Sequence, residues 1–147
     1  MGNIGTKLYD ESIKNNLFLK PNQSIHLAIV NQPFLNYILN GEKRIESRFS
    51  INKCSPYKKV KENDIVFIKD SGKSIIAYFI VKKVEYYINN NENIINHIKS
   101  NYANDICAFN DEFWEERHKK KYISLIWIKG LTLITPFNVE KKISVHG

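Results

Sequence analysis

Residues 40–49 read Asn-Gly-Glu-Lys-Arg-Ile-Glu-Ser-Arg-Phe and carry five charged side chains within seven positions. The residues before this stretch, 32–40, have apolar side chains at helical spacing, which predicts a short helix there. Pro33 suits the first helical position, because its missing N–H would have no helical partner there anyway. Gly41 follows the last apolar residue, where a left-handed cap needs a residue without a Cβ. We therefore expect the helix to end where the charged stretch begins.

Beyond Gly41 the pattern changes to alternation, which predicts a strand from Lys43 onwards. One face of this strand carries Ile45, Ser47 and Phe49, and the other carries Arg44, Glu46 and Arg48. Lys43 lies at the start of the strand, where the loop can turn it toward either face. The charged face is either an exposed surface of Arg–Glu pairs, each contributing about 0–1 kcal/mol, or the wall of a cleft. In the second interpretation Lys43, Glu46 and Arg48 hold a polar ligand.

The rest of the chain shows more strand patterns than helix patterns. The expected strands cover residues 25–30, 65–69, 75–84, 122–128 and 131–134. A turn is expected between the last two, at Lys129 and Gly130. Helical spacing recurs over residues 94–102, and Asn110 can cap another helix that has acidic residues in its first turn and basic residues at its end. We therefore expect an α+β fold.

The octapeptide at residues 41–48 resembles the Gly-x-Lys-x-x-Glu-x-Arg signature of the ASCH domain, a branch of the PUA-like superfamily. Further segments resemble elements of that family in the same order: strands or helices at residues 26–30, 33–39, 61–67, 111–114 and 125–128. The resemblance covers about residues 24–136. It implies a PUA-like small β-barrel, mostly antiparallel with about five to six strands, flanked by two or three helices. A cleft would lie beside the first helix.

The length of 147 residues suits one domain. We place it at residues 25–136, after a flexible N-terminal arm (1–24) and before a C-terminal tail (137–147). No apolar run reaches the ~18–20 residues of a membrane span and the start does not read as a signal peptide, so we expect a cytoplasmic protein without a membrane partner. The two cysteines and four histidines are isolated in the sequence, so we expect no metal and no cofactor.

The formal net charge of +7 favours a polyanionic partner such as RNA. We expect RNA or a modified nucleoside to bind through Lys43, Glu46 and Arg48, with Ser71 and Trp114 as further contacts. The fork of Arg48 suits a carbonyl, phosphate or base edge, and Glu46 can accept from an exocyclic amine. The loop after the motif is expected to contact RNA phosphates without reading the base sequence. Its basic residues are Lys53, Lys58 and Lys59.

Two other functions are open. For some ASCH proteins the resemblance implies hydrolysis of N4-acetylcytidine, or cleavage of RNA, with the motif lysine as the catalytic group. Lys43 would take that role here, together with Glu46, which stands where the amidohydrolases have a threonine nucleophile. A further acidic residue of those enzymes has three candidates in this chain: Asp111, Glu112 and Glu115. The last alternative is a protein-interaction module whose basic surface serves solubility.

Catalysis makes a demand on the pKa of Lys43. A general base works best near the operating pH, so the pKa must fall from ~10.4 by roughly two to three units, which costs about 3–4 kcal/mol. Burial lowers the pKa of a lysine, and a carboxylate such as Glu46 within ~4–6 Å raises it. We therefore expect Lys43 to remain a charged binding residue unless Glu46 is bound to Arg48 or Arg44.

Overall fold

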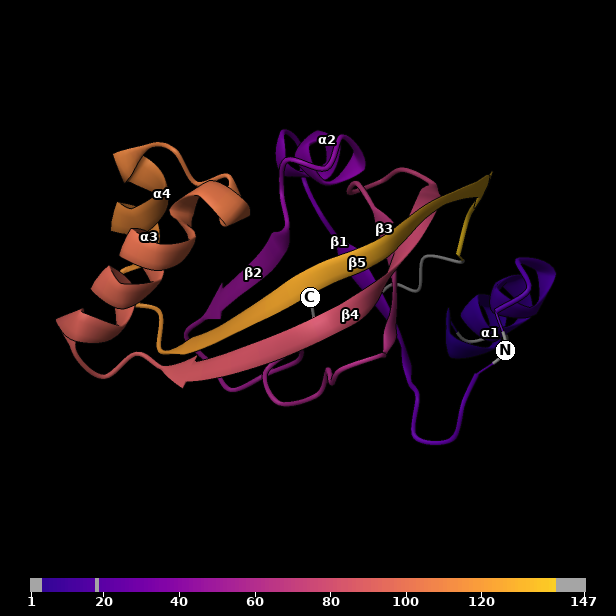
Figure 1. The fold of residues 1–147 in the computed structure, drawn as a ribbon, viewed down its shortest axis with the longest axis horizontal. Helices are drawn as coiled ribbons and strands as arrows, with labels where there is room; N and C mark the ends of the chain where they lie inside the picture. Colours follow the sequence, from indigo (N-terminus) through magenta and orange to yellow (C-terminus); the bar gives the residue numbers. More distant parts are fainter. Residues whose placement is uncertain (1–3, 18, 140–147) are drawn as a thin grey trace.

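The computed structural model describes residues 4–17 and 19–139. Nine elements follow one another within these described residues: α1 (Ile4–Lys14), β1 (Ile25–Ile29), α2 (Phe34–Leu39), β2 (Ile45–Ser50), β3 (Ile65–Lys69), β4 (Ile75–Ile88), α3 (Glu92–Ile106), α4 (Asp111–Arg117) and β5 (Tyr122–Phe137). The strands form one sheet in the order β1-β3-β4-β5-β2, with α3 and α4 at one end of the molecule and α1 at the other (Figure 1). Only β1 and β3 pair in parallel among the described strands, so the predicted α+β class and the mostly antiparallel sheet are both confirmed.

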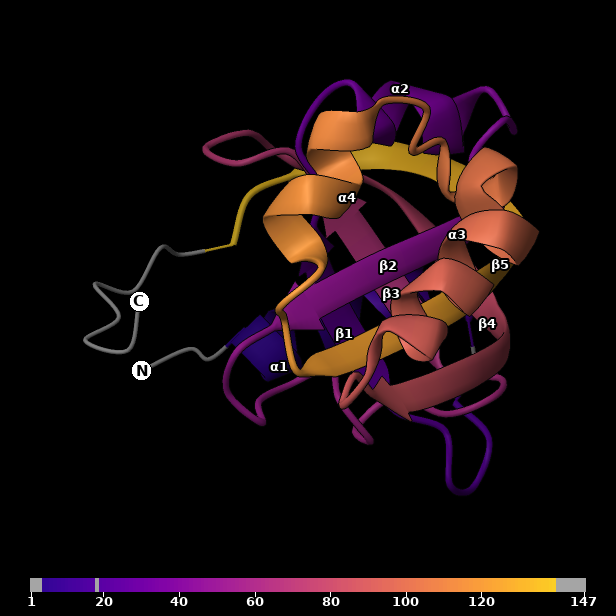
Figure 2. The same cartoon turned by 90° about the vertical axis from the view of Figure 1, so that its left-hand side faces the viewer.

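The predicted barrel is not closed. The two edge strands, β1 and β2, are not neighbours in the strand order, although the sheet curls (Figure 2). Instead of a backbone ladder, the side chain of Arg48 on β2 donates a hydrogen bond to the backbone carbonyl of Ile29 on β1. Three helices, α2, α3 and α4, lie within residues 25–136, as expected, and α1 adds a fourth among the described residues.

The end of the sheet differs from the expected two strands and a turn. β5 runs without a break from Tyr122 to Phe137 and pairs with β4, which itself extends to Ile88. Gly130 has a φ of 61°, and the pairing of the two strands shifts register three times. A left-handed residue inside a ladder adds a bulge and a bend, so the glycine that predicted a turn instead curves a long strand.

Part of the segment expected as a flexible N-terminal arm is the helix α1. Its Leu8 is buried and packs with Phe67, Ile75 and Tyr78 on the side of the sheet that faces away from the curl. Within the helix, the Ser12 hydroxyl donates to the Leu8 carbonyl at 2.8 Å. Of the expected C-terminal tail, Phe137 belongs to β5, and residues 140–147 lie outside the described residues.

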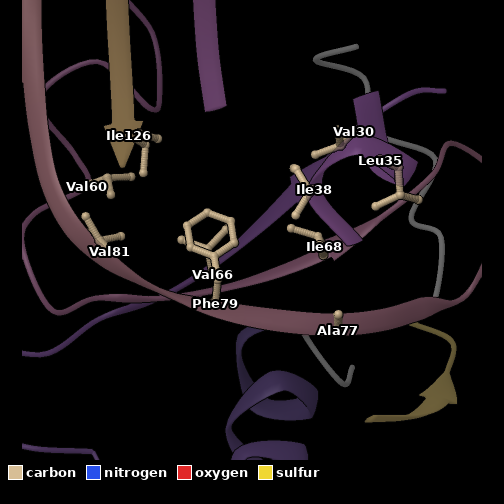
Figure 3. Packing of buried hydrophobic residues seen from close by; sticks show 10 residues of the cluster. All are labelled: Val30, Leu35, Ile38, Val60, Val66, Ile68, Ala77, Phe79, Val81 and Ile126. Carbon is tan, nitrogen blue, oxygen red and sulfur yellow. The ribbon is translucent and has the colours of Figure 1, made fainter. Parts of the chain in front are cut away.

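The inner face of the curl holds a hydrophobic core that α2 covers. The cluster comprises Val30, Leu35, Ile38, Val60, Val66, Ile68, Ala77, Phe79, Val81 and Ile126. Figure 3 shows Phe79 at its centre, between Ile38 of α2 and Val60 of the loop before β3. Full burial of such side chains contributes roughly 1.5–3 kcal/mol each, so this core fixes α2, and the segment that follows it, against the sheet.

The charged stretch begins with the predicted change of direction. Gly41 has a φ of 85°, which confirms the left-handed cap after α2. Pro33 occupies the N-cap position rather than the first helical position. The next strand begins at Ile45, two residues later than expected, because the N–H groups before it bond outside the sheet. Lys43 donates to the carbonyl of Tyr37, and Arg44 to the carbonyl of Asp105.

Candidate functional site

Two cavities lie on either side of the Glu46–Arg48 pair. The first, of about 590 Å³, lies inside the curl between the edge strands, and residues from all five strands line it. The second, of about 290 Å³, lies between the start of α2, β2 and α4. Four residues line both: Ile29, Glu46, Arg48 and Phe49. The pair therefore forms the wall that the two cavities share.

Glu46 and Arg48 lie on the same strand face, as alternation predicted, and they bind each other. Arg48 donates to Glu46 Oε2 from Nε at 3.0 Å and from Nη2 at 2.7 Å. The Glu46 residue is only 5% exposed, and its Oε1 also accepts from the Ser47 N–H at 3.2 Å. Arg48 is more exposed and uses Nη2 again on Ile29, so Nη1 has no hydrogen-bond partner among the described residues. The guanidinium is therefore held in place, and its Nη1 can still donate a hydrogen bond.

Lys43 turns toward this pair from the loop before β2. Its residue is 3% exposed, and Nζ donates to the carbonyl of Ile106 at 2.9 Å. The same nitrogen lies 3.5 Å from Glu46 Oε1 and 5.2 Å from the ring centroid of Phe34. Burial lowers the pKa of Lys43, and the attraction of Glu46 offsets this only in part, since Glu46 is bound to Arg48. The sequence predicted a lowered pKa for Lys43 only if Glu46 is bound to Arg48 or Arg44, and this condition is met.

A second hydrogen-bonded pair borders the first cavity. His26 lines this cavity from β1, and its Nε2 donates to Asp64 Oδ2 at 2.8 Å. The Asp64 carboxylate is fully buried and also accepts from the N–H of Ser24 and from both the N–H and Nζ of Lys61. Burial alone would raise the pKa of Asp64, but the hydrogen bonds from His26, Ser24 and Lys61 outweigh it and hold the pKa below its usual range. An ionised Asp64 therefore orients His26 at the cavity.

Arg117, at the end of α4, borders the second cavity. Its guanidinium carbon lies 3.8 Å from the ring centroid of Phe113 and 5.8 Å from that of Phe49. Nη1 donates to the Phe113 carbonyl at 3.1 Å and lies 3.5 Å from Glu116 Oε2. Burial lowers the pKa of Arg117, but an arginine keeps its charge in proteins. Cation–π contacts and a backbone hydrogen bond thus fix a positive charge at the mouth of the cavity.

The structure brings together three of the predicted ligand contacts, Lys43, Glu46 and Arg48. Trp114 and Ser71 are not among the described residues that line either cavity. Trp114 packs in a separate apolar cluster with Ile98 and Ile123, where its Nε1 donates to the Ala108 carbonyl at 3.2 Å. Ser71 lies in the exposed turn after β3. The predicted phosphate contacts Lys53, Lys58 and Lys59 are exposed on the loop between β2 and β3. Part of that loop, at Cys54, Ser55 and Pro56, borders the first cavity.

The acidic candidates Asp111, Glu112 and Glu115 are exposed on α4 and line neither cavity.

Sequence reasoning missed several polar residues at the cavities, among them His26, Ser124 and Arg117. Ser124 is 2% exposed, pairs with Arg48 across the sheet and lines the first cavity. The alternating pattern of the strands could have indicated two of them, because His26 and Ser124 are polar residues on otherwise apolar, inward-facing sides of their strands. Arg117 gave no such signal, because a basic residue at a helix end is also explained by the helix dipole.

Among residues 4–17 and 19–139, no group of three or more His, Cys, Asp or Glu side chains is placed to hold a metal ion. No helix in this part of the chain has the length and apolar character needed to cross a membrane.

The sequence matches no known family model and no curated protein. The structure, however, is similar to that of ASCH from Zymomonas mobilis, with a TM-score of 0.57 and 15% identity over 77% of this chain and 72% of that one. A serine-to-alanine variant of the same protein gives a TM-score of 0.59, covering 81% and 77% of the two chains. A protein from Enterococcus faecalis V583 gives 0.56, at 12% identity over 88% of each chain. The chain therefore has the fold of ASCH-domain proteins, as its sequence resemblance implied, and function is argued from the site.

Proposed function

We propose that this domain binds a nucleobase, carried by RNA or by a free or modified nucleoside or nucleotide, in the first cavity. The observation that carries the proposal is the Glu46–Arg48 pair, which places a fixed donor beside a fixed acceptor in a cavity wall. Ligand sites usually combine an apolar lining with a few well-placed polar groups in ~300–1,000 Å³. The volume of about 590 Å³ lies within that range.

The chemistry of the pair suits the polar edge of a base. Arg48 Nη1 can donate to a ring carbonyl or an acyl oxygen, and the Glu46 carboxylate beside it is the acceptor for an exocyclic amine. Apolar side chains of Val66, Phe79 and Ile126 line the same cavity and suit the flat faces of a base. His26, held by Asp64, adds a ring nitrogen as a further polar contact.

RNA adds phosphates outside the cavity, and we propose that the basic loop binds them. Lys53, Lys58 and Lys59 are exposed, and the loop that carries them also borders the first cavity. A strand with one base in the cavity would thus pass over these lysines. Such contacts strengthen binding without reading the base sequence, in keeping with the net charge of +7.

Arg48→Ala tests the proposal. Calorimetric titration of the wild type with the four common ribonucleosides, N4-acetylcytidine and short single-stranded RNA identifies a ligand. Loss of a charge-assisted hydrogen bond should then weaken the affinity for it by roughly tenfold to a hundredfold. Arg44→Ala is the matched control, because Arg44 is exposed and lines neither cavity. Equal affinity of the Arg48 and Arg44 variants would contradict the assignment of Arg48, and no binding to any of these compounds would contradict the function.

A hydrolase is the second candidate, because a buried lysine with a lowered pKa lies beside the candidate base site. If the wild type releases product from N4-acetylcytidine or RNA, Lys43→Met should abolish turnover while ligand affinity stays within about tenfold. This is the signature of a group that acts in the transition state. Product release and binding are measured on the same samples, with Lys59→Met as the control, since Lys59 is exposed on the loop. Turnover that survives Lys43→Met would exclude Lys43 as the catalytic group.

A further inference from the structure

The two cavities on either side of the Glu46–Arg48 pair differ in charge. The lining of the first includes one acidic residue, Glu46, and one basic residue, Arg48, so its formal charge is zero when His26 is counted as neutral. The second has three basic residues, Lys43, Arg48 and Arg117, against one acidic residue, Glu46, which leaves a net charge of +2 among its lining residues. An uncharged base is thus best placed in the first cavity, and an anion in the second.

We infer that the second cavity holds a phosphate group of the same nucleotide whose base occupies the first cavity. This inference rests on the proposed function and specifies its ligand as a nucleotide rather than a nucleoside. The cavities share four lining residues, and the side chain of Arg48, which is 36% exposed, is the part of the shared wall that solvent reaches. A nucleotide whose ribose passes over this exposed side of Arg48 would place its base in the first cavity and its phosphate in the second.

Arg117 is the residue that makes the second cavity suitable for a phosphate. Lys43 and Arg48 both lie within 4 Å of Glu46, which offsets part of their charge. Among the acidic residues that the structure describes, Arg117 contacts only the exposed Glu116, at 3.5 Å, and its own side chain is 29% exposed. Its Nη1 is bound to a backbone carbonyl, while Nε and Nη2 have no hydrogen-bond partner among the described residues. Two donors therefore remain for phosphate oxygens, in the fork geometry that suits them.

The orientation of Arg117 is set before any ligand binds. Stacking on Phe113 and contact with Phe49 hold the guanidinium, and both rings also line the second cavity. The amide of Asn31, at the mouth of the same cavity, adds an uncharged donor. Preorganised donors lose less conformational entropy on binding, so this arrangement favours a specific contact over loose attraction.

The test compares each ribonucleoside, N4-acetylcytidine included, with its 5′- and 3′-monophosphates by calorimetry at low salt. In the wild type we expect one monophosphate to bind at least tenfold more tightly than its nucleoside, and this advantage to shrink as salt is added. Arg117→Gln should remove most of the advantage and leave nucleoside affinity within about twofold. Arg117→Lys should keep part of it, because the charge remains. Arg44→Gln, which removes an exposed positive charge of the same motif, should leave it unchanged.

The outcomes separate this inference from the function on which it rests. If nucleosides bind and neither monophosphate binds more tightly, the phosphate site is wrong and the base site stands. If Arg44→Gln reduces the advantage as much as Arg117→Gln, net charge explains it and the site at Arg117 is again wrong. If neither nucleosides nor nucleotides bind the wild type but short single-stranded RNA does, the inference of a nucleotide ligand is wrong, and if none of the three binds, the proposed function itself fails. The wild-type comparison needs no variant, so a folding defect in either Arg117 variant does not leave the inference undecided.

Discussion

Glu46→Ala is expected to lower the free energy of unfolding by roughly 3–5 kcal/mol, because it leaves a buried positive charge without its carboxylate partner. Lys43 is 3% exposed, and its remaining hydrogen-bond acceptor among the described residues would be the Ile106 carbonyl, beside the face of the Phe34 ring. Arg48 would also lose two of the three hydrogen bonds that fix its guanidinium. For a chain of this size such a loss corresponds to a fall in melting temperature of about 10 °C.

Thermal unfolding of two further variants shows whether the unpaired charge is the cause. Glu42→Ala removes an exposed acidic residue of the same motif and should change stability by less than about 0.5 kcal/mol. The double variant Lys43→Met with Glu46→Leu removes both charges and should recover much of the lost stability, since apolar replacement of a buried ion pair is often neutral. A melting temperature of Glu46→Ala equal to that of Glu42→Ala would contradict the interpretation.

Asp64→Ala should cost a similar amount, about 3 kcal/mol or more, for a different reason. The buried Asp64 carboxylate accepts four hydrogen bonds, two of them from the backbone N–H groups of Ser24 and Lys61. Its removal leaves those donors without their acceptor and releases His26 at the first cavity, and each lost hydrogen bond to a charged group costs about 1.5–3 kcal/mol. Asp10→Ala, on the exposed side of α1, is the control.

The contribution of Asp64 should also depend on pH in one direction. Its pKa is lower in the folded protein than in the unfolded chain, so the unfolded chain takes up the proton first as the pH falls. The stabilisation is therefore complete above the ordinary pKa of about 4 and is lost as the pH falls through the lower pKa of the folded state. Urea unfolding of wild type and Asp64→Ala between pH 7 and pH 2 should show their difference shrinking only below about pH 4. A difference that stays constant down to pH 2 would contradict the role of the ionised carboxylate.

The parts of the fold that the sequence predicted well depend on neighbouring residues. β3 has the predicted bounds of Ile65 to Lys69, because an apolar run lies between turn residues. Asn110 caps α4 through its side chain, which accepts from the Phe113 N–H at 3.0 Å. Gly41 reverses the chain as expected. Glu46 and Arg48 meet because alternation places residues two apart on the same face.

The parts that the sequence did not predict depend on contacts between distant segments. Gly130 reads locally as a turn, yet β4 supplies a partner along the whole of β5 and turns the glycine into a bulge. The helix α1 is stabilised by burial of Leu8 against β3 and β4, which local composition does not reveal. Arg117 reaches the site only because α4 packs beside β2, some 70 positions after the motif. The cavities result from the open curl of the sheet, which no single segment encodes.

The open sheet has a consequence for how molecules of this protein meet one another. Edge strands expose unpaired N–H and C=O groups that can pair with strands of another chain and start aggregation. Here the edges are short, five residues in β1 and six in β2, and residues of both line the first cavity, so the edges face one another. In addition, the side chain of Arg48 donates a hydrogen bond to the edge carbonyl of Ile29 on β1. The open gap between β1 and β2 therefore leaves no long, flat edge among the described strands for a second molecule to extend.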